Sequence, residues 1–283
     1  MATLPPRPHP DNASTGACRL DGGSSHRATL PVMPKPTEFH EAMARALTGV
    51  VPAFQTYDET GSTNDDARAL AREGAAHLTT VVADVQTAGR GRRGRAWIAR
   101  SGDALLASWV IRPTFPVEQW SVLPLIVGVA CVEAVRARTG VDAALKWPND
   151  VMAGERKLGG ILVEAEPPAF AVAGVGINTA ATDFPDDLRT PPTSLAVEGA
   201  SRLDRADLLA AILRSCADLL VDPEASLARY RGLCATLGER VRVDRAQGDP
   251  IEGVARDVDA SGALRIDGER VSTGDVVHLS DAG

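Results

Sequence analysis

The sequence predicts an α/β (α+β) fold, in which a mixed sheet with flanking helices is followed by a small β-barrel. Strand and helix patterns interleave between residues 37 and 237, which is typical of a mixed sheet covered by helices. After Gly238 the pattern changes to short alternating strands separated by Gly and Asp turns. Residues 1–36 show neither pattern. We therefore divide the chain into a leader (1–36), a main domain (37–237) and a C-terminal domain (238–283).

The leader is rich in Pro, Gly and Ser and lacks the apolar core of a signal peptide. We interpret it as a disordered segment, because such a composition buries too little apolar surface to fold. Translation that starts at Met33 is the alternative, and it would make residues 1–32 an artefact of start-site choice. The intact mass of the native protein distinguishes the two.

The first half of the main domain alternates helices and strands. Its first helix is capped by Thr37, places Phe39, Met43 and Leu47 on one face, and ends at Gly49. The other predicted elements are a helix from Ser62 to Gly74, strands Leu78–Gln86 and Ala104–Ile111, and an apolar helix Gln119–Arg138.

The second half continues this alternation and leads into the C-terminal domain. Its predicted elements are strands Ala143–Trp147, Lys157–Glu166 and Ala169–Ile177, and helices Arg205–Leu220 and Pro223–Leu237. Asp222 caps the last helix and Pro223 takes its first position. The C-terminal strands are predicted at 241–243, 251–255, 263–266 and 276–279. So small a domain is marginal alone, and we expect it to pack against the main domain.

The composition excludes several classes of protein. With a net charge of −7 the chain is not expected to present a general surface for nucleic acid, so any basic site must be local. We find no apolar run of about 18 residues and expect no membrane span. The scattered cysteines form no CxxC pair and no metal-ligand spacing, which favours a reducing, cytoplasmic location.

A glycine-arginine segment, Gly89–Arg95, follows a predicted strand and precedes Trp97. Glycines let the backbone approach a ligand closely, and successive amides with arginines form an anion-binding concavity. A solvated basic loop and an RGG-like RNA contact are the alternatives. RGG segments usually repeat within disordered chain, whereas this one occurs once inside a folded pattern.

Lysine is rare in this chain, and two of its three lysines flank one short tract. Of the 30 basic residues only Lys35, Lys146 and Lys157 are lysine. Lys146 begins the tract 146–150, in which Pro148 turns the chain and Asp150 could bind Mg²⁺. A compact lysine charge is not interchangeable with an arginine fork at a site for carboxylates or phosphates. Taken alone, the tract could also be an ordinary strand-ending turn.

Two neighbouring strands are interrupted by glycines, at Gly159-Gly160 and at Gly174-Val175-Gly176. Glycine inside a strand allows close approach by a ligand or another backbone, or marks a bulge. Both interruptions fit a flat pocket floor. The tract Ser62-Thr63-Asn64 is most simply a helix cap, although its side chains could also bind a polar ring.

Taken together, five motifs resemble those of the bacterial biotin protein ligases, and the resemblance covers about residues 37 to 283. The motifs, in the order of the family, are 62–64, 86–95 with Trp97, 146–150, 157–164 and 174–178. The resemblance implies a catalytic domain with the fold shared by class II aminoacyl-tRNA synthetases, followed by an SH3-like barrel. It also implies a two-step reaction, in which biotin and ATP give biotinyl-5′-AMP and the biotinyl group then passes to a carrier lysine.

The same resemblance implies roles for single residues. Catalytic roles fall to Lys157, Arg92, Lys146 and Asp150, with Asp150 also a ligand for Mg²⁺. Biotin would be bound by Ser62, Thr63, Asn64, Gln86, Gly89, Arg90, Gly91, Arg92, Lys157, Gly174 and Gly176. ATP and the adenylate would be bound by Arg92, Arg93, Arg95, Trp97, Lys146, Asn149 and Asn178.

The implied partner is the biotin carboxyl carrier domain of acyl-CoA carboxylases. Relatives often begin with a DNA-binding helix-turn-helix, which 36 proline-rich residues would not form, so we expect no DNA binding. We also expect a monomer or a weak homodimer. A ligase for lipoate or another acyl acid, and a non-enzymatic biotin-responsive regulator, are the two alternatives.

Overall fold

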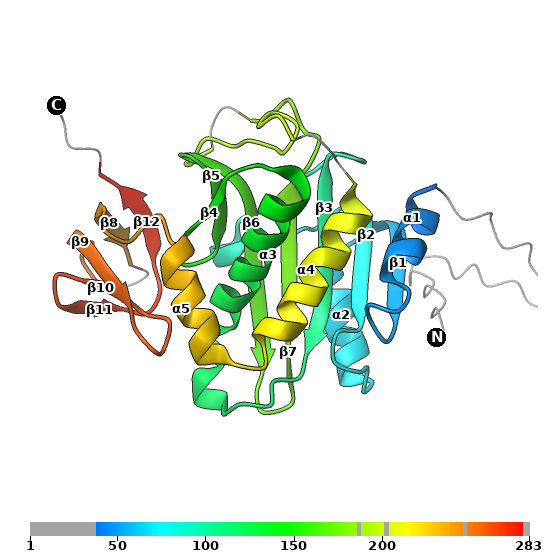
Figure 1. The fold of residues 1–283 in the computed structure, drawn as a ribbon, viewed down its shortest axis with the longest axis horizontal. Coiled ribbons are helices and arrows are strands. Elements are labelled where there is room, and N and C mark those ends of the chain that lie inside the picture. Colours follow the sequence, from blue (N-terminus) through cyan, green and yellow to red (C-terminus); the bar gives the residue numbers. More distant parts are fainter. Residues whose placement is uncertain (1–37, 186–187, 201–203, 246–247, 280–283) are drawn as a thin grey trace, which may run out of the picture.

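A computed structural model of the chain describes residues 38–185, 188–200, 204–245 and 248–279. Within these ranges the chain forms one seven-stranded sheet and one five-stranded sheet. The larger sheet lies at the centre of Figure 1, and the smaller one lies beside it, next to α5. The predicted mixed α/β domain followed by a small all-β domain is thereby confirmed. The predicted leader and the Thr37 cap lie outside the described residues.

The large sheet is mixed, as predicted. Its strand order is β1-β2-β3-β7-β6-β5-β4. β1 and β2 run parallel, and the other neighbours are antiparallel. The strands are β1 (Phe54–Thr60), β2 (Thr80–Gln86), β3 (Ala104–Ile111), β4 (Ala143–Lys146), β5 (Asp150–Ala153), β6 (Arg156–Glu166) and β7 (Phe170–Asn178).

The two faces of this sheet are covered unequally. The helices are α1 (Glu38–Leu47), α2 (Thr63–Arg72), α3 (Leu123–Thr139), α4 (Arg205–Leu219) and α5 (Pro223–Leu233). α3 and α4 pack on one face and enclose the main apolar core, in which α3 is buried on nearly every side. On the opposite face α2 covers only a small cluster that includes Ala67, Val110 and Val172. The rest of that face is not covered by α2.

Two predicted helices have different bounds in the structure. The segment Val117–Val122 is a 3₁₀ helix, and the α-helix begins at Leu123 with Pro124 in its first turn. The last helix was predicted to reach Leu237 but ends at Leu233. That prediction was wrong because the following residues leave the helix to pair with β4: Cys234 bridges Leu145, and the amide of Ala235 donates to the Leu145 carbonyl at 2.8 Å.

Three strands were not predicted. β1 carries polar residues along much of its length and is the edge of the sheet. No strand was predicted at β5, which follows the predicted turn 146–150, yet β5 forms a hairpin with β4 and also pairs with β6. The third is β11 (Glu269–Val271), which has only three residues. Short or half-exposed strands show little alternation, so the sequence pattern misses them.

The C-terminal sheet has the order β11-β10-β9-β8-β12. Its other strands are β8 (Arg240–Asp244), β9 (Ile251–Val258), β10 (Leu264–Ile266) and β12 (Asp275–His278). It contacts the main domain as expected: the indole Nε1 of the buried Trp147 donates to the Gly262 carbonyl at 3.0 Å, and Ser121 donates to the Ser261 carbonyl at 2.8 Å. The division near Gly238 stays a prediction.

One apolar segment requires a correction. By length and composition the helical stretch Val117–Thr139 is long enough to cross a membrane, contrary to the prediction that no such run exists. Because 72% of its most apolar window is buried inside the protein, it has the character of a core helix.

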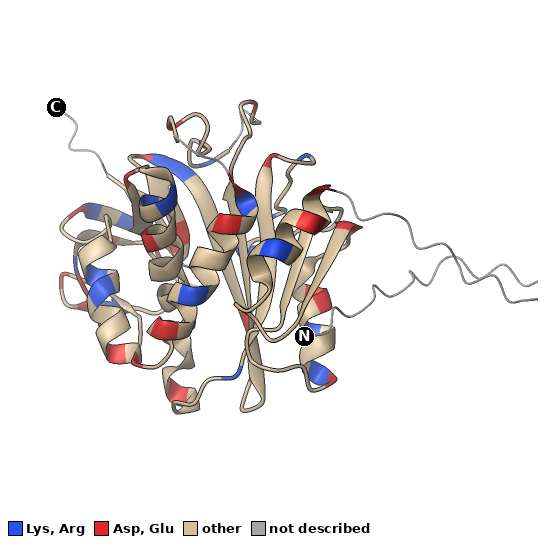
Figure 2. Ribbon diagram, turned by 45° about the vertical axis from the view of Figure 1, so that its right-hand side comes forward, with Lys and Arg blue, Asp and Glu red and all other residues tan. Residues whose placement is uncertain are grey.

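On the elements visible in Figure 2, acidic and basic residues are interspersed, as expected for a protein without a broad basic surface. Three cysteines, Cys131, Cys216 and Cys234, are buried and unbridged.

Candidate active site

A cavity of about 280 Å³ opens on the sheet face that α2 leaves uncovered. Its walls come mainly from the start of α2, the hairpin 89–97, strands β6 and β7, and residues 188–192, with further residues from β2, β3 and the turn between β4 and β5. Among its described lining residues, five are cationic, namely Arg90, Arg92, Arg95, Lys157 and Arg189, and one is acidic, Asp150. The cavity therefore suits an anionic ligand with flat or apolar parts.

The floor of the cavity is made by glycines on β6 and β7. Gly160 lies opposite Gly176 in the strand register, and Gly174 follows on the same face. A Cβ at Gly174 would lie 2.0 Å from Asn64 Oδ1, and one at Gly176 would lie 2.5 Å from Cε2 of Trp97. These glycines are needed because α2 and the indole approach the strands closely. The predicted flat floor is present, although in this structure Trp97 rests on it.

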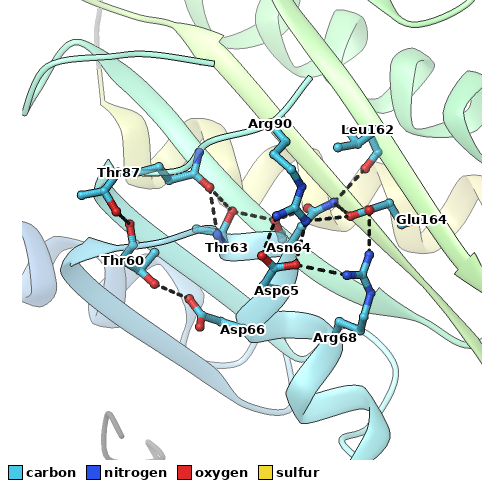
Figure 3. Close-up of polar contacts among 12 residues, drawn as sticks. Thr60, Thr63, Asn64, Asp65, Asp66, Arg68, Thr87, Arg90, Leu162 and Glu164 are labelled. Carbon is cyan, nitrogen blue, oxygen red and sulfur yellow. Dashed lines mark hydrogen bonds and ion pairs between the residues drawn. The ribbon is translucent and has the colours of Figure 1, made fainter. Parts of the chain in front are cut away.

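A chain of polar side chains connects α2 to the floor (Figure 3). Gln86 Oε1 accepts from the amide and the hydroxyl of Thr63, and Thr63 contacts the hydroxyl of Ser108 at 2.7 Å. Ser108 donates to Asn64 Oδ1, and Asn64 Nδ2 donates to Glu164 Oε2, both at 2.7 Å. Because each member holds the next, these donors and acceptors are fixed before a ligand arrives.

Ser62 occupies the N-cap position of α2 but makes no side-chain capping hydrogen bond. Its backbone carbonyl accepts from the amides of Asp65 and Asp66. The residue is buried, and it lines the cavity. Its position fits the cap interpretation, while its side chain leaves the ligand-binding interpretation open.

Arg90 is held at the edge of the cavity by a bidentate ion pair. Its two terminal nitrogens lie 2.5 and 2.6 Å from the oxygens of Asp65, and one lies 3.5 Å from Glu164 (Figure 3). The hydrogen bond from Arg90 lowers the pKa of Asp65, against the opposing effect of burial. Burial would raise the pKa of Glu164, but hydrogen bonds from Asn64 and Arg68 outweigh it and lower the pKa.

We predict that replacing Asp65 with Asn makes stability less dependent on pH. A carboxylate whose pKa is lowered by folding gives its full stabilisation above the ordinary pKa of 3.8, and this contribution is lost as pH falls from that value through the lower pKa of the folded state. At pH 7 the variant should unfold about 1 kcal/mol more easily at most, because the pair is partly exposed. Urea denaturation between pH 7 and pH 3 measures this. A difference that stays constant over this range would contradict the assignment.

The glycine-arginine segment forms a small hairpin. Gly91 donates to the Arg95 carbonyl at 2.7 Å, and Trp97 donates to the Gly89 carbonyl at 2.9 Å. The turn requires left-handed backbone at Arg93 (φ 57°) and Gly94 (φ 72°). A Cβ at Gly89 would lie 2.4 Å from the Trp97 carbonyl oxygen, so glycine is needed there for packing. The loop is therefore a defined element that carries its arginines along one side of the cavity.

Lys157 and Arg92 reach the cavity from separate elements. Lys157 Nζ lies 2.7 Å from Asp150 Oδ1 and 6.0 Å from the centre of the Trp97 ring. Arg92 donates to Asn149 Oδ1 at 3.1 Å, and burial lowers its pKa. The two cations thus face one cavity, as the interpretation of the sequence requires.

Most of the predicted site residues line this cavity. They are Ser62, Thr63, Asn64, Gln86, Arg90, Gly91, Arg92, Arg95, Trp97, Asn149, Asp150, Lys157, Gly174, Gly176 and Asn178. Gly89, Arg93 and Lys146 are not among the lining residues. Lys146 lies opposite Asp150 in the register of β4 and β5, and burial lowers its pKa. Its predicted role at the phosphates stays a prediction, as do the roles of the others.

Sequence reasoning assigned no role to Ser108, Glu164 or Arg189. Ser108 is the one hydroxyl residue in β3, which is otherwise apolar and fully buried, and that contrast was a usable signal. Glu164 ends a recognised motif and binds Asn64. Arg189 comes from an irregular segment that carries no periodic pattern, so nothing local pointed to it.

The cavity offers one ligand for Mg²⁺. Asp150 is its only described carboxylate, and no cluster of three acidic, His or Cys side chains exists among the described residues. Mg²⁺ is commonly held by one or two carboxylates together with substrate phosphates and water. Asp150 therefore fits a Mg²⁺ ion that arrives with a nucleotide. Such an ion would help to neutralise the charge of the phosphates.

A larger hollow of about 700 Å³ lies elsewhere, lined by residues of α3 and α4. Its charged side chains already have partners: Arg138 pairs with Asp207 at 3.4 Å, and Arg205 pairs with Asp84 at 2.7 Å. Asp204 caps α4. The hollow offers no convergent set of open polar groups, and we assign the chemistry to the smaller cavity.

Comparison with known proteins identifies the family of this chain. Residues 58–178 match the biotin/lipoate A/B protein ligase family, and residues 236–279 match the biotin protein ligase C-terminal domain. A biotin–[acetyl-CoA-carboxylase] ligase of Mycobacterium tuberculosis is 40% identical over 235 residues, which cover 78% of this chain and 87% of the relative. The chain belongs to the biotin protein ligase family. The five sequence motifs had implied this membership.

Other members show how the chain aligns within the biotin protein ligase family. The bifunctional ligase/repressor BirA of Bacillus subtilis is 36% identical over 163 residues, and the chain spans only half of its length. A solved biotin protein ligase from Aquifex aeolicus, in complex with biotin and ATP, superposes with a TM-score of 0.68 at 27% identity. The match covers 79% of this chain and 97% of that one. The match therefore extends over nearly all of the Aquifex structure.

Proposed function

We propose that this chain is a biotin–protein ligase, which activates biotin with ATP and transfers the biotinyl group to a lysine of a biotin carboxyl carrier domain. One observation supports this most directly: Arg92 and Lys157, which belong to distant segments, face one glycine-floored cavity beside a fixed polar network. The Mycobacterium relative carries the same activity in its name, and the Aquifex structure holds biotin and ATP.

In the first step a biotin carboxylate oxygen attacks the α-phosphorus of ATP. The bond from that phosphorus to the bridging oxygen breaks, and pyrophosphate leaves with the electron pair. The step brings two anions together, so fixed positive charge is needed where they meet. Lys157 and Arg92 supply it, and the polar network around Thr63 and Asn64 orients the biotin ring.

In the second step the uncharged amine of the carrier lysine attacks the acyl carbon. AMP leaves with the electrons of the carbon–oxygen bond, and the nitrogen gives up a proton as the amide forms. Until then the mixed anhydride must be kept from water. The hairpin 89–97 lies over the glycine floor through Trp97, and it is the element that can cover the intermediate.

Transfer of labelled biotin to a purified carrier domain, with ATP, tests the proposal. We expect label on the carrier lysine and none without ATP. Absence of transfer to an intact carrier would refute the function. Competition of lipoate against biotin in pyrophosphate exchange separates the lipoate ligase alternative: we expect lipoate to compete poorly, since Ser62, Thr63 and Asn64 present donors and acceptors for a ring with polar atoms.

We predict that Arg92→Gly releases activated biotin. Arg92 donates to Asn149 at 3.1 Å and to Thr273, in the turn between β11 and β12, at 2.8 Å, so its loss should let the hairpin open. Labelling of a bystander protein, with no carrier present, should rise about 10-fold over the unmodified chain, which corresponds to roughly 1.4 kcal/mol. Equal bystander labelling would contradict a covering role for this residue.

Three further expectations accompany the proposed function. We expect no DNA binding, because the net charge is −7 and many arginines outside the cavity are paired with acidic side chains, such as Arg72 with Glu166 and Arg256 with Asp267. A gel shift in the presence of biotinyl-5′-AMP tests the regulator alternative. We expect a monomer or weak homodimer, tested by sedimentation, and a cytoplasmic location, in keeping with the three buried, unbridged cysteines.

A further inference from the structure

The mouth of the cavity has two rims that are distant in sequence. One is the hairpin 89–97, and the other is the segment 188–192, which contributes Leu188 and Arg189 to the lining. Neither rim is a regular helix or strand of the large sheet. Both carry arginines, so their mutual repulsion must be offset by negative charge from another element.

That charge comes from the C-terminal sheet, at Asp275. Its two carboxylate oxygens accept separately from Arg93 Nη1 and Arg95 Nη2, each at 3.0 Å. Arg189 Nη1, from the opposite rim, lies 3.5 Å from the same carboxylate. The side chain of Asp275 is only 17% exposed, so these pairs are less screened by solvent than ordinary surface pairs.

Asp244 provides a second contact between the C-terminal sheet and both rims of the cavity. It lies directly opposite Asp275 in the register of β8 and β12. Its backbone carbonyl accepts from Arg93 Nη2 at 3.2 Å, and its carboxylate pairs with Arg189. The hydrogen bond from Arg189 lowers the pKa of Asp244. Two carboxylates on facing strands would repel one another, and here the arginines of the two rims compensate them.

The backbone around Asp275 is shaped for this contact. A Cβ at Gly274 would lie 2.2 Å from Cγ1 of Val243, so a glycine allows the chain to pass close to β8 just before Asp275. One residue earlier, Thr273 accepts from Arg92 at 2.8 Å. Three consecutive residues, two in the turn after β11 and one at the start of β12, thus take part in or permit the contact with the hairpin.

We propose that Asp275 is a positioning residue, with which the C-terminal sheet holds both rims of the cavity together and so retains the acyl-adenylate. The proposal rests on the proposed function for its second half. The first half, that Asp275 fixes the hairpin, concerns the protein without any ligand. Asp275 does not line the cavity, so its effect on the intermediate is exerted through the arginines.

The test compares Asp275→Asn with Glu252→Gln, a matched control. Glu252 lies on β9 of the same sheet, and its ion pair with Arg242 spans 3.9 Å. Arg242 also donates to Asp244 at 3.1 Å, and the change at Glu252 leaves that bond and the contacts of Asp275 in place. Limited trypsin digestion of the ligand-free chains measures cleavage after Arg92, Arg93 and Arg95. We expect Asp275→Asn to be cut several-fold faster there, while the control and the unmodified chain are cut alike, at unchanged melting temperatures.

A second readout follows loss of preformed labelled adenylate after an excess of unlabelled biotin is added. We expect release from Asp275→Asn to be about 3- to 10-fold faster, equivalent to roughly 0.7–1.4 kcal/mol. Release should rise with salt more steeply in the unmodified chain than in the variant, because the variant has already lost the ion pairs of Asp275 that salt would weaken. Asp275→Glu should restore part of the retention. A merely structural role would not produce this salt dependence.

The two readouts separate the possible failures. If the unmodified chain forms no adenylate, the proposed function fails, while the trypsin experiment still tests the contact. Equal cleavage and equal release in a folded Asp275→Asn would overturn the inference. If that variant does not fold, Arg93→Gln removes the same contact from the hairpin, and adenylate release that matches the unmodified chain would overturn it as well.

Discussion

Replacing Lys157 with Ala should lower the rate of biotin-dependent pyrophosphate exchange by at least about 100-fold. The side chain brings a positive charge to a cavity where a carboxylate and a phosphate must meet, and removing one such preorganised group costs about 2.7–4 kcal/mol of transition-state stabilisation. The change also removes the ion pair of Asp150, whose Oδ1 lies 2.7 Å from Lys157 Nζ. The backbone should hold, since the amide and carbonyl of Lys157 bond residues 191 and 193 independently of the side chain.

Arg156→Ala is the matched control for this prediction. Arg156 precedes Lys157 on β6, but its side chain is 47% exposed and pairs with Glu198 at 2.9 Å, outside the cavity. Exchange should stay within about 2-fold, because an exposed pair contributes at most about 1 kcal/mol. Lys157→Arg should also be impaired, since a planar fork does not replace a compact charge. If the Lys157→Ala variant keeps a rate of pyrophosphate exchange within a few-fold of normal, Lys157 does not have the proposed role in adenylate formation.

Replacing Gly176 with Ala should raise the KM for biotin by at least about 10-fold. A Cβ there would lie 2.5 Å from the Trp97 ring, and a rigid indole yields only by moving as a whole. Displacing it disturbs the hairpin, because the Trp97 amide donates to Gly89. Overpacking of this kind typically costs 1–3 kcal/mol, so the melting temperature should fall too. Steady-state kinetics and thermal denaturation together measure both effects.

Gly232→Ala provides the control for a glycine change as such. Gly232 lies in α5, and a Cβ there would meet nothing within 4 Å. Alanine is favoured over glycine in a helix by about 1 kcal/mol, so this variant should be slightly more stable and fully active. An unchanged KM in Gly176→Ala would show that the indole does not need its position on the floor.

Local sequence patterns predicted an element correctly where the residues of that segment alone decide its structure. The apolar run 104–111 became a fully buried strand with the predicted bounds, and Asp222 with Pro223 opened α5 as expected. The patterns failed where the structure of a segment depends on the strand with which it pairs. Residues 234–237 have the composition of a helix, yet pairing with β4 draws them out of it. β1 is mixed in polarity because it lies at an edge.

The sequence by itself determined the chemistry that this chain can carry: a glycine-arginine hairpin, two lysines kept among arginines, and glycines interrupting two adjacent strands. These are properties of residue type and order, and folding does not alter them. Only the tertiary structure decided which of them meet. It placed Ser108 between Thr63 and Asn64, and it joined two rims of a cavity through Asp275. Such contacts depend on strand register and on packing between distant segments, and no local spacing encodes either of them.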